Sequence, residues 1–301
     1  MNWKDALNDF NYYLKLERGL SDNSIVSYSY DIQKLITFLE KNKISVSPIK
    51  IDENQIQEFI YEVAKTMNTT SQARIISGLR SFFDYLVFEN YRDKNPLELV
   101  EAPKIGRKLP DTLNLEEIDL LIRTVDLSHP QGERNRAIIE TLYSCGLRVS
   151  ELINLKISDL FFEENFIKVT GKGDKQRFVP VSPVTKKYIL LYKNEIRIHQ
   201  TPKKGKEDIL FLNRRGNQLT RAMIFTIVKD LAEKANLNKN ISPHTFRHSF
   251  ATHLLENGAD LSSIQQMLGH ESIATTEIYM HIDNKKLFDV LEKYHPRSNK
   301  S

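Results

Sequence analysis

The sequence predicts a mainly α-helical protein with one small β-sheet, divided into two domains. Along most of its 301 residues, apolar side chains recur every three to four positions, which is the period of a helix buried on one face. One stretch near the middle alternates instead with the period of a strand. A short segment after the first hundred residues combines prolines with cations, as interdomain linkers often do. We therefore expect two helical domains, the second of which carries the sheet.

The first domain, residues 1–103, is predicted to be a helical bundle. Its first helix presents an apolar face made of Trp3, Leu7, Phe10 and Leu14. Ser21 is placed to cap a second helix that runs to Leu39, because a serine oxygen can accept from the free N–H groups of a first turn. Two more amphipathic helices are expected over 52–66 and 71–88. Four such helices with short joints predict a compact bundle.

The linker is predicted over residues 104–110, followed by a second domain over 111–301. Its sequence, Lys104-Ile-Gly-Arg-Lys-Leu-Pro110, combines helix breakers with three cations. The cations fit a solvated tether and equally a strap that lies against phosphates.

The second domain is predicted to be mostly helical with one β-hairpin. Strands over 166–170 and 176–181 flank a turn with two glycines, which places Lys172 near the tip of the hairpin. Gly146 follows the helix expected over 132–144 at the position where a left-handed residue commonly ends a helix. The other helices are expected over 115–125, 185–197, 221–235, 243–257, 261–268 and from 273 onward.

Composition is that of a globular protein, with 40% hydrophobic and 27% charged residues. The sequence has no apolar run of membrane-spanning length and no signal-peptide core, so we expect a cytoplasmic protein with no membrane partner. The single cysteine, Cys145, lies among apolar residues and is expected to be a buried thiol. Residues 1–103 carry 12 basic and 15 acidic side chains and the rest carries 31 and 24, so the second domain is the better candidate for polyanion contacts.

Two short motifs could carry chemistry. Ser242-Pro243-His244 opens a helix, and Arg247 lies three residues after His244 and therefore on the same face. A phosphate at this helix N-terminus would meet an imidazole, a guanidinium and backbone N–H groups together. Upstream, Arg148 is expected at the start of a helix, with Glu151 one turn on to orient it.

Each motif also has a structural interpretation. His244 and His248 are spaced for a metal, but no carboxylate ligand lies nearby in sequence, so no metal or other cofactor is expected. Arg148 and Glu151 could be a structural ion pair. The segment 261–281 resembles a helix-turn-helix, which would read DNA without catalysis. Tyr279 alone would more often be a half-buried aromatic side chain, and His253 and His281 are expected to be surface or packing residues.

Taken together in chain order, the motifs resemble the active-site set of the tyrosine recombinases, the phage integrase family. The six matching positions are Arg148, Lys172, His244, Arg247, His270 and Tyr279. The likeness is greatest to the Xer group, and it extends from Arg18-Gly-Leu-Ser21 through the stretch 244–260 to His295-Pro-Arg297. The resemblance implies an N-terminal core-DNA-binding domain and a C-terminal catalytic domain that breaks and rejoins DNA without metal or ATP.

The resemblance also implies roles and partners. Arg148, Arg247 and His270 would hold the scissile phosphate, Tyr279 would attack it, Lys172 would protonate the leaving group, and His244 is our candidate base. The implied partners are a dif-like DNA site, a tetramer on DNA that can include a XerC-like paralogue, and an FtsK-type translocase, in chromosome dimer resolution at cell division. The alternatives are a phage- or transposon-type integrase, an enzyme that only relaxes DNA, and a non-catalytic DNA-binding protein.

Overall fold

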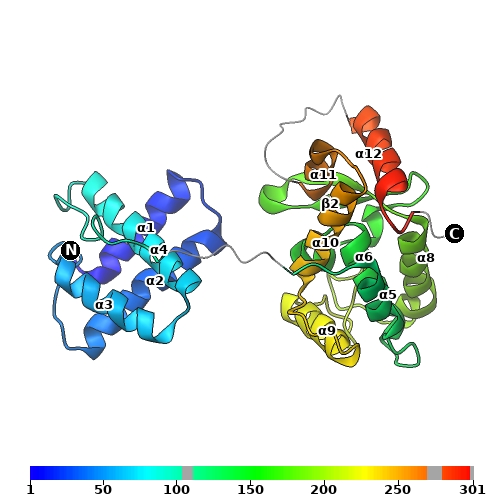
Figure 1. Cartoon of the computed structure of the whole chain (residues 1–301). Helices are drawn as coiled ribbons and strands as arrows, with labels where there is room; N and C mark the ends of the chain where they lie inside the picture. The colour runs from blue at the N-terminus through cyan, green and yellow to red at the C-terminus, as the bar shows by residue number, and fades with distance from the viewer. Residues whose placement is uncertain (104–110, 270–279, 299–301) are drawn as a thin grey trace. The chain divides into compact units, whose positions relative to one another are not determined.

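In the computed structural model, residues 1–103, 111–269 and 280–298 are described. The chain divides into two compact units, Met1–Lys108 and Leu109–Ser301 (Figure 1). The predicted linker over 104–110, with its three cations, lies outside the described residues. No helix in the described part of the chain is long and apolar enough to cross a membrane.

The first unit is a bundle of four helices, as predicted. They are α1 (Trp3–Leu16), α2 (Asp22–Lys41), α3 (Glu53–Thr66) and α4 (Thr69–Phe88). A side-chain oxygen caps the first turn of each helix, and these caps are Asn2, Ser21, Asp52 and Asn68. The core contains a ring cluster in which Phe10 packs edge-on against Phe82, and both side chains are fully buried. The predicted cap at Ser21 is confirmed.

The second unit is mostly helical with a small sheet, so the predicted fold class is confirmed. Its helices are α5 (Leu115–Arg123), α6 (Gly132–Ser144), α7 (Val149–Asn154), α8 (Pro183–Leu191), α9 (Arg221–Lys234), α10 (Pro243–Glu256), α11 (Leu261–Leu268) and α12 (Met280–Tyr294). Short helical turns η1 (Ile157–Asp159), η2 (Lys172–Asp174), η3 (Tyr192–Ile196) and η4 (Arg197–His199) lie between them. The helix predicted over 185–197 begins earlier, at Pro183, because Ser182 caps it, and its last part is the π-helical η3.

The sheet is antiparallel in the order β1 (Leu160–Phe161), β2 (Phe166–Thr170), β3 (Gln176–Pro180). β2 and β3 form the predicted hairpin, and Lys172 begins the turn between them as the first residue of η2. Val169 lies opposite Arg177 in this hairpin. The two-residue β1 was not predicted, because a strand this short shows no alternation.

α6 is the centre of the second unit, and every residue from Ala137 to Cys145 is buried. It packs against α5, α7, α8 and α10. Gly146 follows it with a φ of +57°, so the predicted helix end is confirmed. Cys145 is the buried thiol that the sequence predicts, and burial raises its pKa.

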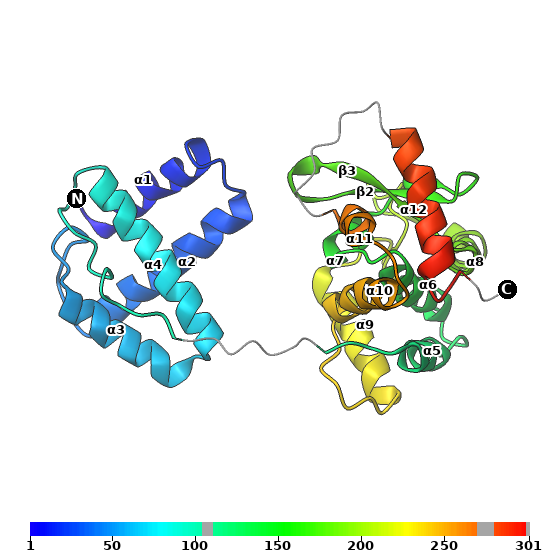
Figure 2. The same ribbon diagram turned by 45° about the horizontal axis from the view of Figure 1, so that its top comes forward.

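α12 packs against α10, α11 and β3, as seen in Figure 2. Its apolar residues Leu287, Val290 and Leu291 are buried in the core of their own unit. This stripe fits either docking on a neighbouring chain or packing within its own domain, and the structure shows it packed within the domain. The ring of His295 and the guanidinium of Arg297 continue that packing and are buried too.

Candidate active site

Arg148 is fixed at the start of α7 by a glutamate one turn further on. Its backbone N–H donates to Glu151 Oε2 at 2.8 Å, and its guanidinium Nη1 donates to Glu151 Oε1 at 2.9 Å. The first contact is one half of a capping box, in which a carboxylate at the third helical position closes back on the cap residue. The predicted orienting role of Glu151 is therefore confirmed.

Arg247 reaches from α10 to the C-terminal ends of two other helices. Its Nη1 donates to the carbonyl oxygen of Gly146 at 2.7 Å, after α6, and its Nη2 donates to that of Leu268 at 2.6 Å, at the end of α11. The last carbonyls of a helix have no partner within the helix and carry the negative end of its dipole. A buried guanidinium is well suited to both carbonyls, and only 11% of this side chain is exposed.

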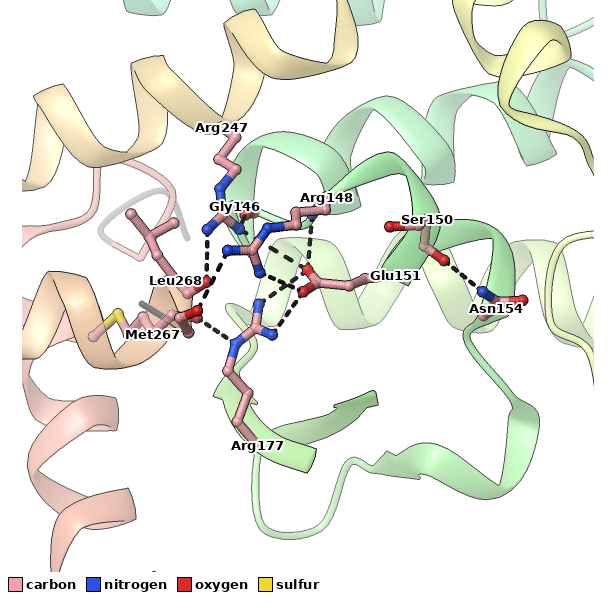
Figure 3. Close-up of polar contacts among 10 residues, drawn as sticks. Gly146, Arg148, Ser150, Glu151, Asn154, Arg177, Arg247, Met267 and Leu268 are labelled. Carbon is pink, nitrogen blue, oxygen red and sulfur yellow. Dashed lines mark hydrogen bonds and ion pairs between the residues drawn. The ribbon is translucent and has the colours of Figure 1, made fainter. Parts of the chain in front are cut away.

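A third arginine, Arg177 on β3, completes the cluster. Its Nη1 and Nη2 donate to the two carboxylate oxygens of Glu151 at 2.8 and 3.0 Å, and its Nε donates to the carbonyl of Met267 at 2.8 Å. Figure 3 shows Arg148, Arg177 and Arg247 converging on Glu151 and on the end of α11.

Positive charge exceeds negative charge among these four side chains, which comprise three guanidinium groups and one carboxylate. Burial alone would raise the pKa of Glu151, but hydrogen bonds from Arg177 and Arg148 lower it below its ordinary value. Burial, together with the charge of Arg148, lowers the pKa of Arg247 to about 10. The carboxylate is thus ionised at neutral pH, and arginine side chains in general keep their charge there, so the cluster carries a net charge of plus two.

This excess charge is partly open to solvent. The side chain of Arg148 is 35% exposed, whereas that of Glu151 is 1% exposed. A planar guanidinium can donate two parallel hydrogen bonds to a phosphate, and part of the Arg148 group is accessible for this. The arrangement can therefore bind an oxyanion such as a backbone phosphate.

The hairpin turn begins beside this cluster. A Cβ placed on Gly171 would lie 3.6 Å from Glu151 Oε1 and 3.8 Å from Arg177 Nη1. Lys172 is the next residue, so the structure places its backbone at the edge of the cluster.

His244 is the second residue of α10, directly after Pro243, and its side chain is exposed. Ser242 precedes the helix, and its backbone N–H donates to Thr245 Oγ1 at 3.1 Å. His244 is thus one turn before Arg247 on a helix whose N-terminal N–H groups can also bind an anion.

His270 and Tyr279 lie outside the described residues. The chain approaches the first of them through Gly269, which has a φ of +66° and ends α11 as predicted. The carbonyl of Gly269 accepts from Arg148 Nη2 at 3.3 Å, so the residue before His270 is joined to the cluster. The described chain resumes at Met280, the first residue of α12 and the one after Tyr279.

The other histidines of the motif region have different surroundings. The side chain of His248 is exposed, and among the described residues no group of three histidine, cysteine or acidic side chains gathers in a way that could hold a metal. His253 is half-buried, and its Nδ1 shares a hydrogen bond of 2.8 Å with the hydroxyl of Tyr143. His253 is therefore the packing residue that the sequence predicts.

Arg177 is the member of this cluster that sequence reasoning missed. Its partners, Glu151 and Met267, are 26 and 90 residues away in the chain. The available signal was its register in the hairpin, since Arg177 lies opposite the buried Val169 and so faces the interior, where an unpaired arginine is costly.

The chain matches two family profiles. The profile of the Phage integrase family covers residues 111–286, and that of the Phage integrase N-terminal SAM-like domain covers residues 7–90. Most of both structural units falls within these matches.

Curated relatives match over nearly the whole chain. The tyrosine recombinase XerD of Oceanobacillus iheyensis is 42% identical over 294 residues, which are 97% of this chain and 99% of that protein. XerD of Staphylococcus saprophyticus is 43% identical over 287 residues, 95% of this chain and 97% of that protein.

Solved structures of recombinases are also similar to this chain. XerH site-specific recombinase bound to its difH substrate, before cleavage, is 27% identical with a TM-score of 0.67, over 83% of this chain and 74% of that one. XerA recombinase is 32% identical with a TM-score of 0.50, over 98% of this chain and 100% of that one. A lambda integrase dimer on a core site shares the fold, with a TM-score of 0.70 at 17% identity over 92% of this chain and 100% of that one.

Proposed function

The chain belongs to the phage integrase family and is a tyrosine recombinase, and on this premise we propose that it cleaves and rejoins DNA through a 3′-phosphotyrosine link to Tyr279. The resemblance found in the sequence is thereby confirmed. DNA is the substrate class of the family, and solved relatives are complexes with DNA.

The observation that carries the proposal is the set of cations around Glu151. Arg148 directly precedes α7 and Arg247 lies in α10, and both are fixed by hydrogen bonds to protein groups before any ligand binds. Fixed cations need no reorganisation when negative charge builds up on a pentacoordinate phosphorus, so they stabilise the transition state more than the ground state. We assign these two arginines to the scissile phosphate, and His270 as a further donor to it.

Proton transfers complete the proposed reaction. A tyrosine phenol ordinarily has a pKa of about 10, so attack by Tyr279 on phosphorus requires a base or a stabilised phenolate. His244 is the candidate base. The P–O5′ bond breaks as the Tyr279 ester forms, and the departing 5′-oxygen takes a proton from Lys172.

The proposed reaction conserves bond energy. One phosphodiester is exchanged for another, so a 5′-hydroxyl from a partner duplex can attack the Tyr279 ester and restore the DNA backbone without ATP. No metal takes part in this scheme, because the two arginines supply the positive charge.

For the biological role, we propose chromosome dimer resolution at a dif-like site in the cytoplasm. The support is the identity of 40–43% to proteins named XerD over 95–98% of the chain. The role requires four protomers around two DNA sites, with either a XerC-like paralogue or identical subunits, and with an FtsK-type translocase as activator. A phage- or transposon-type integrase is the alternative within the same chemistry.

Trapping on DNA tests the proposal. On a nicked suicide substrate that contains a candidate dif site, the wild type should accumulate a covalent protein–DNA adduct. Tyr279→Phe should bind the same DNA and form no adduct. An adduct that persists in this variant would refute the assignment of the nucleophile, and DNA binding with no adduct from the wild type would favour a non-catalytic DNA-binding protein.

A second assay separates exchange from relaxation. Two duplexes that carry the site should yield recombinant products, with the paralogue or translocase added where required. Relaxation of supercoiled DNA with no exchange under every such condition would favour a topoisomerase-like enzyme.

A further inference from the structure

Arg177 lies on β3 and contacts groups on two other elements of the second unit. It binds both oxygens of Glu151, the carbonyl of Met267 in α11, and lies against Gly269, where an added Cβ would come within 3.1 Å of its side chain. Three elements, β3, α7 and the end of α11, are therefore joined through one guanidinium.

We propose that Arg177 is a positioning residue that neutralises Glu151, so that the charges of Arg148 and Arg247 stay available to the scissile phosphate. The inference rests on the proposed function of the site. It assigns to Arg177 a role that acts through Glu151 and not through contact with DNA.

Arg177 pairs with Glu151 more extensively than Arg148 or Arg247 does. Arg177 makes a two-pronged ion pair with both carboxylate oxygens, at 2.8 and 3.0 Å, while the guanidinium of Arg148 makes a single bond at 2.9 Å. Arg247 is farther away, with its Nη1 3.9 Å from Glu151 Oε2. Of the three guanidinium groups, Arg177 is thus the main partner of the carboxylate.

Without Arg177, the Glu151 carboxylate would act on the two remaining arginines. The Glu151 side chain is 1% exposed, so water cannot replace the lost partner, and a buried charge that keeps only the single guanidinium bond from Arg148 is poorly compensated. The nearest remaining cations are Arg148 and Arg247. Glu151 would draw both toward itself, and the net charge of the cluster would fall from plus two to plus one.

Protein groups occupy the guanidinium nitrogens of Arg177. The side chains of Arg177 and Arg247 are similarly exposed, at 14% and 11%, so exposure does not distinguish them. All three nitrogens of the Arg177 guanidinium donate to protein oxygens, whereas the bonds of Arg148 and Arg247 to protein groups come from Nη1 and Nη2. A guanidinium used in this way has little capacity left for a phosphate. Its effect on cleavage must therefore pass through Glu151 and the end of α11.

The test is a charge-balance rescue. Arg177→Met removes the charge and keeps an unbranched side chain, and we expect it to slow single-turnover cleavage by about 10- to 100-fold at saturating enzyme. Adding Glu151→Gln removes the uncompensated carboxylate and returns the cluster to a net charge of plus two. The double variant should therefore cleave at least about tenfold faster than Arg177→Met alone.

Arg197→Met is a matched control, because Arg197 is also a buried arginine of the second unit whose Nε and Nη2 donate to the carbonyls of Ile209 and Glu207. It should lower the thermal midpoint without changing the cleavage rate of the folded protein. Arg177→Lys, which retains a charge, should cleave faster than Arg177→Met and guards against a loss of folding in the latter.

Two outcomes would overturn the inference. One is a double variant that is no faster than Arg177→Met, and the other is full cleavage by folded Arg177→Met. Both are read against a wild type that forms the Tyr279-dependent adduct. If the wild type forms none, the proposed function fails, whereas an active wild type without the rescue removes only the role of Arg177.

Discussion

Arg247 donates a hydrogen bond of 2.6 Å to the carbonyl oxygen of Leu268, the last residue of α11. Through its other terminal nitrogen it also holds the carbonyl of Gly146, after α6. The candidate phosphate ligand is therefore part of the packing between these helix ends. Substitutions that displace either end should affect both the stability of the second unit and the position of its cations.

Gly146→Ala should destabilise the second unit by about 3 kcal/mol. Gly146 has a φ of +57°, where a side chain is strained, and an added Cβ would lie 2.5 Å from a ring carbon of Phe250 and 3.1 Å from Leu268. The free energy of unfolding can be followed by hydrogen exchange of the α6 amides. Tryptophan fluorescence would not serve, because the single tryptophan, Trp3, lies in the first unit.

Gly205→Ala is the control for this substitution. Gly205 has a φ of +78°, but no atom lies within 4 Å of an added Cβ, so the cost should be the backbone strain alone, about 1 kcal/mol. Equal costs at Gly146 and Gly205 would show that contact with Phe250 is unimportant.

Much of this fold could be predicted because local signals agree with the tertiary structure. The caps at Ser21 and Ser182 and the left-handed glycines at 146 and 269 mark helix ends by their own chemistry. The start of α8 at Pro183 was nonetheless missed, because the helix was predicted from residue 185, although a serine followed by a proline is a helix-start signal. β1 was missed because two residues show no period.

The candidate site was predictable in part. Arg148 and Glu151 are three residues apart, so a helix alone brings them together. The hairpin pattern indicated Lys172 and the spacing to His244 indicated Arg247, and the family resemblance implied their roles. Arg177 could not be found in this way, because its pairing with Glu151 depends on how the hairpin packs on α7. The spacing of apolar residues also does not show which surface covers Leu287, Val290 and Leu291 of α12. Only the packed structure shows that they are buried in their own unit.

Arg297→Met should destabilise the second unit by about 3 kcal/mol. Arg297 is 7% exposed and forms ion pairs with Asp119 and, at 3.3 Å, with Glu140, which is fully buried. Removing the cation leaves the Glu140 carboxylate uncompensated. Adding Glu140→Gln should recover part of the loss in a denaturant titration monitored by circular dichroism, and no recovery would mean that Arg297 acts through packing alone.

The stability that Glu151 contributes should depend on pH. Because its pKa is lowered from the ordinary 4.5, the unfolded chain binds more protons in acid, and the stabilisation is present above pH 4.5 and is lost as pH falls through the folded pKa. Glu151→Gln should therefore cost more free energy of unfolding near neutrality than in acid.

Glu140 provides the opposite case within the same unit. Burial raises its pKa, so any stability linked to its protonation is present in acid and is lost as pH rises through the folded pKa. The unfolding free energy of the wild type minus that of Glu140→Gln should therefore fall as pH rises. The same trend with pH for both variants would contradict the assigned pKa directions.

Cleavage should persist in excess chelator. The cluster already supplies two net positive charges at the proposed phosphate position, so the reaction needs no divalent cation. The rate of adduct formation on the suicide substrate, measured with and without EDTA, should be unchanged, while a metal-dependent nuclease in the same buffer loses activity. Loss of cleavage in EDTA, restored by Mg²⁺, would contradict the two-arginine scheme.

Lys172→Ala should be rescued by a better leaving group. An alkoxide needs a proton as it departs, whereas a thiol, with a pKa of about 8.5, leaves as the thiolate. The variant should lose about 10²- to 10⁴-fold in cleavage of ordinary DNA and much less on a substrate with sulfur in place of the bridging 5′-oxygen. Lys175→Ala, from the same turn, is the matched control and should show no such difference between substrates. Equal losses on oxygen and sulfur would remove Lys172 from the proton transfer and leave it an electrostatic role, since a charge that only binds phosphate serves both substrates alike.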